Sequence, residues 1–247
     1  MRIVTLLQDE VYSGPLVLVN RRQPLKVGLS DDLIPIDARH PKILLDRTAA
    51  KFLAACIQEV GGEEEIVPVS GWRSRTEQKH IWNQALEDHG VGFSQKYVAP
   101  PGCSEHQTGL AIDLGRAAEE IDFLRPYFPD TGKCGAFRRL AVQYGFIQRY
   151  RREKEILTGI AEEPWHFRYV GVPHALLIEA NGLCLEEYVE FLRDGDQTVK
   201  LPDGRCAHIS YVPCSGKETA ILLPEGCCQV SGDNCGGFIV TRWGCSA

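Results

Sequence analysis

The segment that most constrains the fold is Leu110–Leu114, an apolar run that predicts a buried β-strand and carries a single charge, Asp113. A buried carboxylate is costly unless it is paired or binds a metal ion. His106 precedes Asp113 by seven residues, and His166 follows about fifty residues later. Two imidazoles and one carboxylate are the usual protein ligands of a catalytic zinc ion, which keeps a further position open for water or substrate. These three residues therefore predict one Zn²⁺ site per chain.

Glu163 stands three residues before His166, at a spacing that suits a catalytic role. A carboxylate there can reach the metal site without being a ligand, as a general base requires. Pro164 restricts the backbone beside it and helps to fix the direction of the side chain. Each of these residues has a simpler interpretation when taken alone, because a single histidine is more often a surface or core residue than a ligand. The combined spacing is what favours a catalytic zinc site.

Arg73 follows a predicted strand, Ile66–Ser70, and precedes a helix that Ser74 and Glu77 cap. A guanidinium group presents a planar fork of donors, which suits a carboxylate or a developing oxyanion. A structural salt bridge is the alternative interpretation of Arg73. Residues 90–105 are rich in glycine and proline, which predicts a loop of the kind that often displays binding residues. Taken alone, Ser104 in this loop is a turn residue.

The motifs S-x-H-x-x-G-x-A-x-D and E-x-W-H resemble those of the VanX/VanY zinc D-Ala-D-Ala peptidases. The sequence around Ser104–His106 and Glu163–Gly171 is most similar to that of the bifunctional VanXY members. The resemblance covers roughly residues 33–192. It implies that the chain hydrolyses the D-Ala-D-Ala bond of the free dipeptide or of cell-wall precursors, removing the target of vancomycin-type antibiotics. It also implies that Arg73 stabilises the oxyanion, that Gln78 helps to hold the substrate, and that Ser104 contacts it.

The periodicity of apolar residues predicts an α+β fold, with helices packed on a mostly antiparallel sheet that carries the zinc site. We expect a zinc D,D-peptidase domain over residues 1–194, whose N-terminal arm spans residues 1–30 and includes a short strand or packed arm at Leu16–Asn20. Residues 195–247 predict a small Cys-rich all-β module, because short strand-like runs alternate there with Gly, Pro and Asp. The predicted helices are 46–60, one that begins after Ser74, 133–144, 173–180 and 185–192.

The chain of 247 residues has a formal net charge of −6, and no basic cluster predicts binding to nucleic acid or to an anionic membrane surface. The apolar run at the N-terminus is too short for a signal peptide, and no segment has the length of a membrane helix. We therefore expect a cytoplasmic protein, and the family resemblance implies that its partner is a small peptide ending in D-Ala-D-Ala. The role of the β module is open, with a homodimer contact among the alternatives.

Six of the ten cysteines crowd into the tail, at positions 206, 214, 227, 228, 235 and 245. Such density suggests disulfides in a secreted protein, but the absence of an export signal favours reduced thiols. Three alternatives stay open at this point. They are a peptidase of the same fold that cuts another wall-peptide bond, such as L-Ala–D-Glu, a non-catalytic zinc-fold binding module like the hedgehog signalling domain, and a disulfide-stapled secreted protein.

Overall fold

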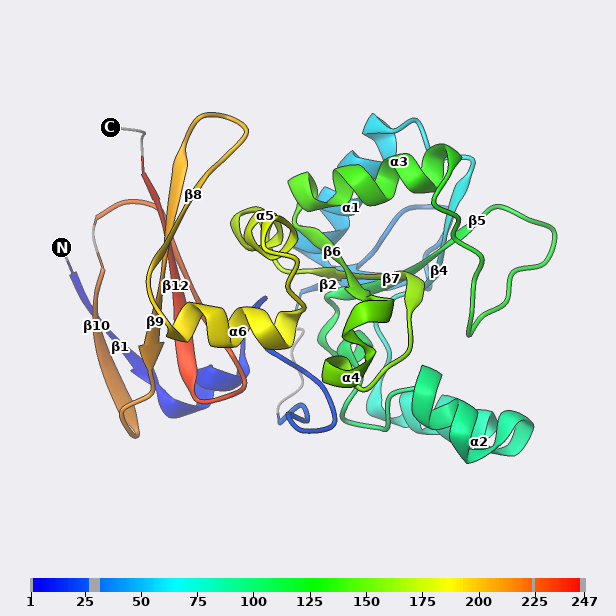
Figure 1. Cartoon of the computed structure of the whole chain (residues 1–247), viewed down its shortest axis with the longest axis horizontal. Helices are drawn as coiled ribbons and strands as arrows, with labels where there is room; N and C mark the ends of the chain where they lie inside the picture. Colours follow the sequence, from blue (N-terminus) through cyan, green and yellow to red (C-terminus); the bar gives the residue numbers. More distant parts are fainter. Residues whose placement is uncertain (1, 27–31, 224, 245–247) are drawn as a thin grey trace.

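The computed structural model describes residues 2–26, 32–223 and 225–244, and these form two parts that lie side by side (Figure 1). One part packs helices on a central antiparallel sheet, and the other is a β module that contains both ends of the chain. Helices α5 (Val172–Ala180) and α6 (Leu185–Arg193) lie between the two parts. The predicted α+β class is confirmed.

The central sheet has four antiparallel strands in the order β4-β5-β7-β6. The strands are β4 (Ile66–Ser70), β5 (Ala111–Arg116), β6 (Phe146–Tyr150) and β7 (Glu163–Tyr169). Helices α1 (Arg47–Glu59) and α3 (Gly132–Leu140) share a core cluster with this sheet, in which Leu53, Phe137 and Phe167 are almost fully buried. The predicted strand at Leu110–Leu114 is therefore central to the sheet and buried on both faces.

The helices begin and end where the local sequence provides caps. Asp46 accepts hydrogen bonds from the backbone N–H groups of Thr48 and Ala49 at the start of α1. Ser74 caps α2 (Arg75–Tyr97) in the same way, by accepting from the N–H of Glu77. The loop predicted over residues 90–105 is confirmed for residues 98–104 and wrong for residues 90–97, because α2 continues to Tyr97 beyond a kink at Gly90. Gly90 takes φ 79°, which a glycine adopts without strain, and the helix resumes after it.

Short elements connect these larger ones. They are the 3₁₀ turns η1 (Gln8–Tyr12), η2 (Glu105–Thr108), η3 (Ala141–Tyr144) and η4 (Arg152–Lys154), the one-turn helix α4 (Glu155–Thr158), and the paired strands β2 (Leu33–Pro35) and β3 (Leu44–Asp46). The helix predicted at 133–144 thus ends as a 3₁₀ turn.

The β module contains a four-stranded antiparallel sheet in the order β11-β12-β9-β8. Its strands are β8 (Gln197–Lys200), β9 (Cys206–Pro213), β11 (Cys228–Gly232) and β12 (Gly237–Gly244). Ile209 and Ile239 on one face share a core cluster with α5 and α6. Phe238 and Val240, on the other face, pack with Leu6 and Ile221 of a separate two-stranded ribbon. The sheet is therefore covered on both faces.

That ribbon ties the N-terminal segment to the C-terminal module, because β1 (Arg2–Leu7) pairs antiparallel with β10 (Glu218–Leu223). The N-terminal strand therefore belongs structurally to the β module. The segment Leu16–Asn20, which was predicted to be a strand or a packed arm, is not assigned as a strand. Its residues 16–19 are buried, and Leu16 and Leu18 share the core cluster of α5 and α6, so the segment is a packed arm. We keep the division at residue 194 as a proposal, with Arg2–Leu7 assigned to the β module.

Nine cysteines lie in the part of the chain that the structure describes, and all are free thiols, whereas Cys245 lies outside it. Within the same described ranges, none of the helices has the length and apolar character needed to cross a membrane.

Candidate active site

Three elements bring the predicted metal ligands together. Asp113 lies on β5 and His166 on β7, and the pairing of these strands places the two residues directly opposite each other. His106 lies on η2, which ends at Gly109 in the left-handed conformation, with φ 72°. That turn directs the chain into β5. His106, seven residues before Asp113 in sequence, therefore lies beside it in space.

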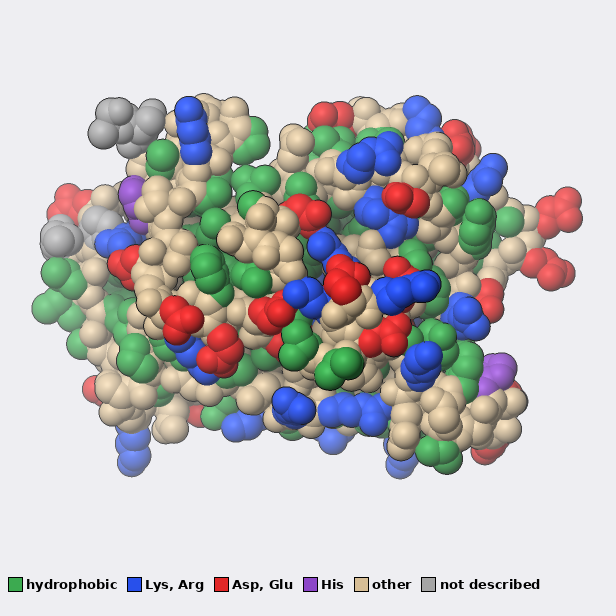
Figure 2. Space-filling view, in the orientation of Figure 1, with side chains coloured by type: hydrophobic (Ala, Val, Ile, Leu, Met, Phe, Trp, Pro, Cys, Tyr) green, Lys and Arg blue, Asp and Glu red, His purple; other side chains and the backbone are tan. Residues whose placement is uncertain are grey.

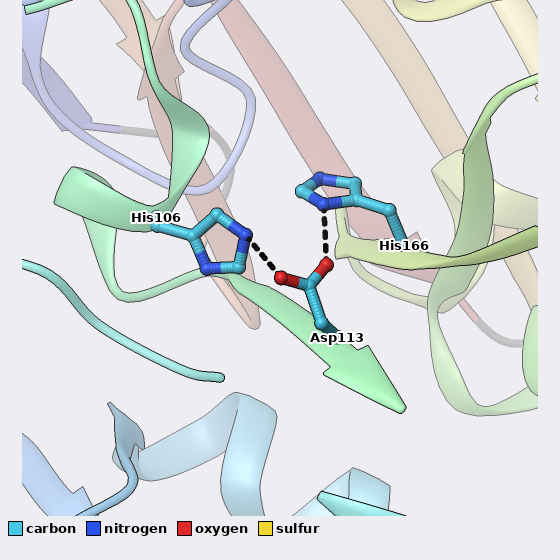
Figure 3. Close-up of side chains that lie close together, drawn as sticks. All are labelled: His106, Asp113 and His166. Atoms are coloured by element: carbon cyan, nitrogen blue, oxygen red, sulfur yellow. Dashed lines mark hydrogen bonds and ion pairs between the residues drawn. The ribbon is translucent and has the colours of Figure 1, made fainter. Parts of the chain in front are cut away.

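The three side chains point toward one another in a buried cluster (Figure 3). His106 Nε2 lies 3.0 Å from one carboxylate oxygen of Asp113, and His166 Nδ1 lies 2.9 Å from the other. One ligand atom from each residue fits within 4.8 Å of the other two. Among the described residues, this is the one group of three His, Cys, Asp or Glu side chains arranged closely enough to hold a metal ion.

In each histidine the ring nitrogen that points away from Asp113, here called the outer nitrogen, faces a hydrogen-bond acceptor, as is usual for metal-binding histidines. His106 Nδ1 lies 2.7 Å from the backbone oxygen of Gly71, and His166 Nε2 lies 3.4 Å from the carboxylate of Glu105. A hydrogen on each outer nitrogen leaves the inner nitrogen with a lone pair for the metal. The arrangement of residues therefore fits a Zn²⁺ ion with two imidazole ligands and one carboxylate ligand.

Glu105 is the functional residue that the sequence analysis missed. Its fully buried carboxylate accepts hydrogen bonds from Arg149 at 2.8 Å and Arg168 at 2.9 Å, and its second oxygen faces His166. Arg149 also forms two hydrogen bonds with Glu186 of α6. One signal was available, since Arg149 is the only charge in the apolar strand β6 and a buried guanidinium requires an acidic partner.

Glu163 and Arg73 both stand next to the predicted metal ligands. A Glu163 carboxylate oxygen lies 3.8 Å from His166 Nδ1, so the residue stands next to the ligands without belonging to the three-residue set. Arg73 donates to Asp113 at 2.8 Å and to Ser70 at 2.8 Å. Both side chains are buried and line the same cavity as the histidines. The structural salt bridge considered for Arg73 is present, and it holds the guanidinium at the metal site.

Gln78 and Ser104 also line this cavity, and both are buried. The Gln78 amide donates to the backbone oxygen of Ala99 at 2.8 Å and accepts from Arg73 at 3.4 Å. Gln78 is therefore placed to orient Arg73. The cavity is narrow, about 40 Å³, and Tyr150 contributes to its wall with its ring 4.9 Å from that of His166.

Charges and burial shift the pKa values of the site in opposite directions. Burial alone would raise the pKa of Asp113, but His106 and His166 outweigh it and hold that pKa well below its usual range. Burial raises the pKa of Glu163 to about 8, against the opposing effect of His166. Burial, together with the charge of Arg73, lowers the pKa of His106 to about 4. A neutral His106 beside an ionised Asp113 is the protonation state that a metal ion requires.

Residues 42–172 match the family described as VanY, D-alanyl-D-alanine carboxypeptidase. The chain is also 39% identical over 187 residues to the bifunctional D-Ala-D-Ala dipeptidase and D-Ala-D-Ala carboxypeptidase VanXYC of Enterococcus gallinarum, a match that covers 75% of this chain and 97% of the relative. The chain belongs to the VanY family. The family resemblance predicted from the motifs is confirmed, and the protein is a peptidase.

Two solved structures extend this family assignment. The vancomycin resistance D,D-dipeptidase VanXYg, solved with a D-Ala-D-Ala phosphinate analogue, matches with a TM-score of 0.95 and 46% identity over 98% of both chains. A VanY D,D-pentapeptidase from a VanB-type resistance cassette, solved with Zn(II), matches with a TM-score of 0.59 and 28% identity over 71% of this chain and 98% of that one. The VanXYg match therefore includes the β module, whereas the VanY match leaves more than a quarter of this chain without a counterpart.

Proposed function

We propose that this VanY-family protein is a zinc-dependent D,D-peptidase that hydrolyses the D-Ala-D-Ala bond of the free dipeptide and of wall-precursor pentapeptides, and so contributes to vancomycin resistance. The observation that carries this proposal is the buried Glu163 carboxylate beside the ligand set His106, Asp113 and His166. The bifunctional relative VanXYC and the VanXYg complex with a D-Ala-D-Ala analogue support the choice of substrate.

His106, Asp113 and His166 would hold the zinc ion, since they form a buried donor set of the kind that catalytic zinc sites use. Zinc bound there supplies a Lewis acid that polarises the scissile carbonyl and makes a water molecule more acidic. Gly71 and Glu105 keep the two imidazole rings in the orientation that binding requires.

The protein's own side chains perform the proton transfers. Glu163 accepts the proton of the attacking water and then gives it to the leaving amine. Arg73 stabilises the oxyanion of the attacked carbonyl through its guanidinium, which its bonds to Ser70 and Asp113 hold in place. Gln78 and Ser104 hold the substrate in the narrow cavity.

Two further parts of the proposal concern the setting of the reaction. We place the enzyme in the cytoplasm, where the free dipeptide and the unfinished wall precursors occur. We also propose that the β module supports a homodimer, which size-exclusion chromatography with light scattering would reveal as twice the mass of the chain.

The decisive experiment measures D-alanine release by zinc-loaded protein from D-Ala-D-Ala and from a pentapeptide ending in D-Ala-D-Ala. Glu163→Ala should retain zinc, measured by metal analysis, and lose about 10²-fold to 10⁴-fold in turnover. Glu153→Ala is the matched control, because Glu153 is an exposed carboxylate on the nearby turn η4. Release of another fragment, or no release by protein that holds zinc, would contradict the proposed function.

A further inference from the structure

A second cavity adjoins the catalytic one and shares two of its walls. Tyr97 at the end of α2 and Trp165 on β7 line both cavities. The second cavity has a volume of about 480 Å³, against about 40 Å³ for the catalytic cavity. We call it the side groove. In the proposed function the terminal dipeptide of the substrate occupies the catalytic cavity, so a longer peptide needs a neighbouring space of this kind for its remaining residues.

The side groove is lined by three cationic side chains and two carboxylates, and only one of the cations forms an ion pair with a carboxylate of the groove. Arg152 is bound to Glu162 at 2.9 Å, so their charges compensate each other. A carboxylate oxygen of Glu155 accepts a hydrogen bond from the backbone N–H of Glu162 at 3.0 Å. Within the described ranges, Lys96 and Arg125 have no carboxylate partner, which leaves two cations open to a ligand.

Lys96 and Arg125 lie over the same aromatic ring. The Arg125 guanidinium is 4.9 Å from the centre of the Tyr97 ring, and the Lys96 ammonium is 5.8 Å from it. Such contacts are weak at an exposed site and leave the donors of both side chains available. Figure 2 shows Lys and Arg side chains gathered along the edge of the molecule below α4 and toward α2. An acidic group on a peptide that extends from the catalytic cavity past Tyr97 would therefore lie close to two cations.

The ligand must be attracted locally, because the chain as a whole has a net charge of −6 and does not favour anions at long range. A wall pentapeptide carries a carboxylate on its D-Glu residue, upstream of the D-Ala whose carbonyl is attacked. A separation of two extended residues spans about 7 Å, which is a short step from the catalytic cavity into the adjoining groove.

We propose that the side groove binds the carboxylate of the upstream D-Glu residue of long substrates through Lys96 and Arg125. This inference rests on the proposed D,D-peptidase function and adds a specificity site to it. The free dipeptide lacks that carboxylate and does not reach the groove. The two cations therefore serve the carboxypeptidase reaction and leave the dipeptidase reaction unaffected.

The test compares wild-type zinc-loaded protein with the double variant Lys96→Gln/Arg125→Gln on three substrates. These are D-Ala-D-Ala, a pentapeptide that contains D-Glu, and the same pentapeptide with the D-Glu carboxylate converted to an amide. Exposed charge pairs contribute little individually, so kcat/KM for the acidic pentapeptide should fall about 5-fold to 10-fold, through KM. The amide pentapeptide and the dipeptide should be hydrolysed as by wild type. Lys200→Gln/Lys217→Gln removes the same charge from exposed sites in the β module and should change nothing.

Two other kinetic outcomes would overturn the proposal for the side groove. Equal loss on all three substrates would show a disturbed catalytic cavity, and no loss on the acidic pentapeptide would show that the cations do not bind it. If the wild-type protein hydrolyses none of the substrates, the proposed function fails. Calorimetric titration of each pentapeptide into the wild-type protein and the double variant then tests binding at the side groove separately. Weaker binding of the acidic peptide alone to the double variant supports the groove, and equal binding to both proteins overturns it.

Discussion

Replacement of Glu105 by glutamine tests the buried charges behind the candidate metal site. Glu105, Arg149 and Arg168 have fully buried side chains. After Glu105→Gln, Arg149 keeps its two hydrogen bonds to Glu186. The remaining amide oxygen then faces Arg168 as a neutral acceptor, beside the backbone oxygens of Pro15, Val17 and Tyr169, and the NH₂ group faces His166 Nε2. The substitution therefore leaves one buried guanidinium without a carboxylate.

A broken buried ion pair costs about 3–5 kcal/mol in the free energy of unfolding. For a chain of this size, that loss lowers Tm by roughly 10 °C. The removal of the acceptor of His166 Nε2 should also weaken zinc binding about 10-fold to 100-fold. Urea unfolding, thermal unfolding and competition with a zinc chelator measure these three quantities.

Glu190→Gln is the matched control, because Glu190 pairs with Arg193 at the surface with 68% of its side chain exposed, and its loss should cost less than about 1 kcal/mol. Glu105→Gln/Arg168→Gln, which removes the unpaired guanidinium, should be more stable than the single variant. A stability loss for Glu105→Gln as small as the control's would refute the energetic reasoning. Unchanged zinc affinity of Glu105→Gln would refute the role of Glu105 in orienting His166 for zinc binding.

Two further predictions concern the surroundings of the site and the junction with the β module. Gly71→Ala should weaken zinc binding, measured by competition with a chelator. The added Cβ would lie 2.3 Å from the backbone oxygen of Leu44, and it would displace the Gly71 carbonyl that holds His106. Gly92→Ala is the control, because Gly92 has open space around it and its substitution should leave zinc binding unchanged. Burial lowers the pKa of His174 to about 3 from 6.5, so the unfolded chain takes up a proton below pH 6.5 that the folded protein refuses. Stability is therefore unaffected by this group above pH 6.5 and falls as the pH drops, by about 2 kcal/mol at pH 5. In urea unfolding at pH 7.5 and 5, wild type should lose about that much more than His174→Gln, and parallel losses in the two proteins would contradict this assignment.

Much of the site was predictable from the sequence because its residues lie in short motifs. The lone charge at Asp113 in an apolar strand, with His106 seven residues before it, indicated metal binding without knowledge of the fold. The strand order then brought His166 opposite Asp113. Glu105 was missed although it stands between Ser104 and His106, because its partners Arg149 and Arg168 are distant in sequence and nothing local indicated its burial.

The sequence by itself determined the elements whose signals are local. Apolar periodicity and a capping residue specify α1, and alternating runs between turn residues specify most strands of the β module. Only the tertiary structure decided which distant segments meet. The pairing of β1 with β10, the salt bridges of Glu105 and the groove beside Tyr97 each join residues far apart in the chain. Such contacts depend on packing and on the burial of charge, which no short stretch of sequence encodes.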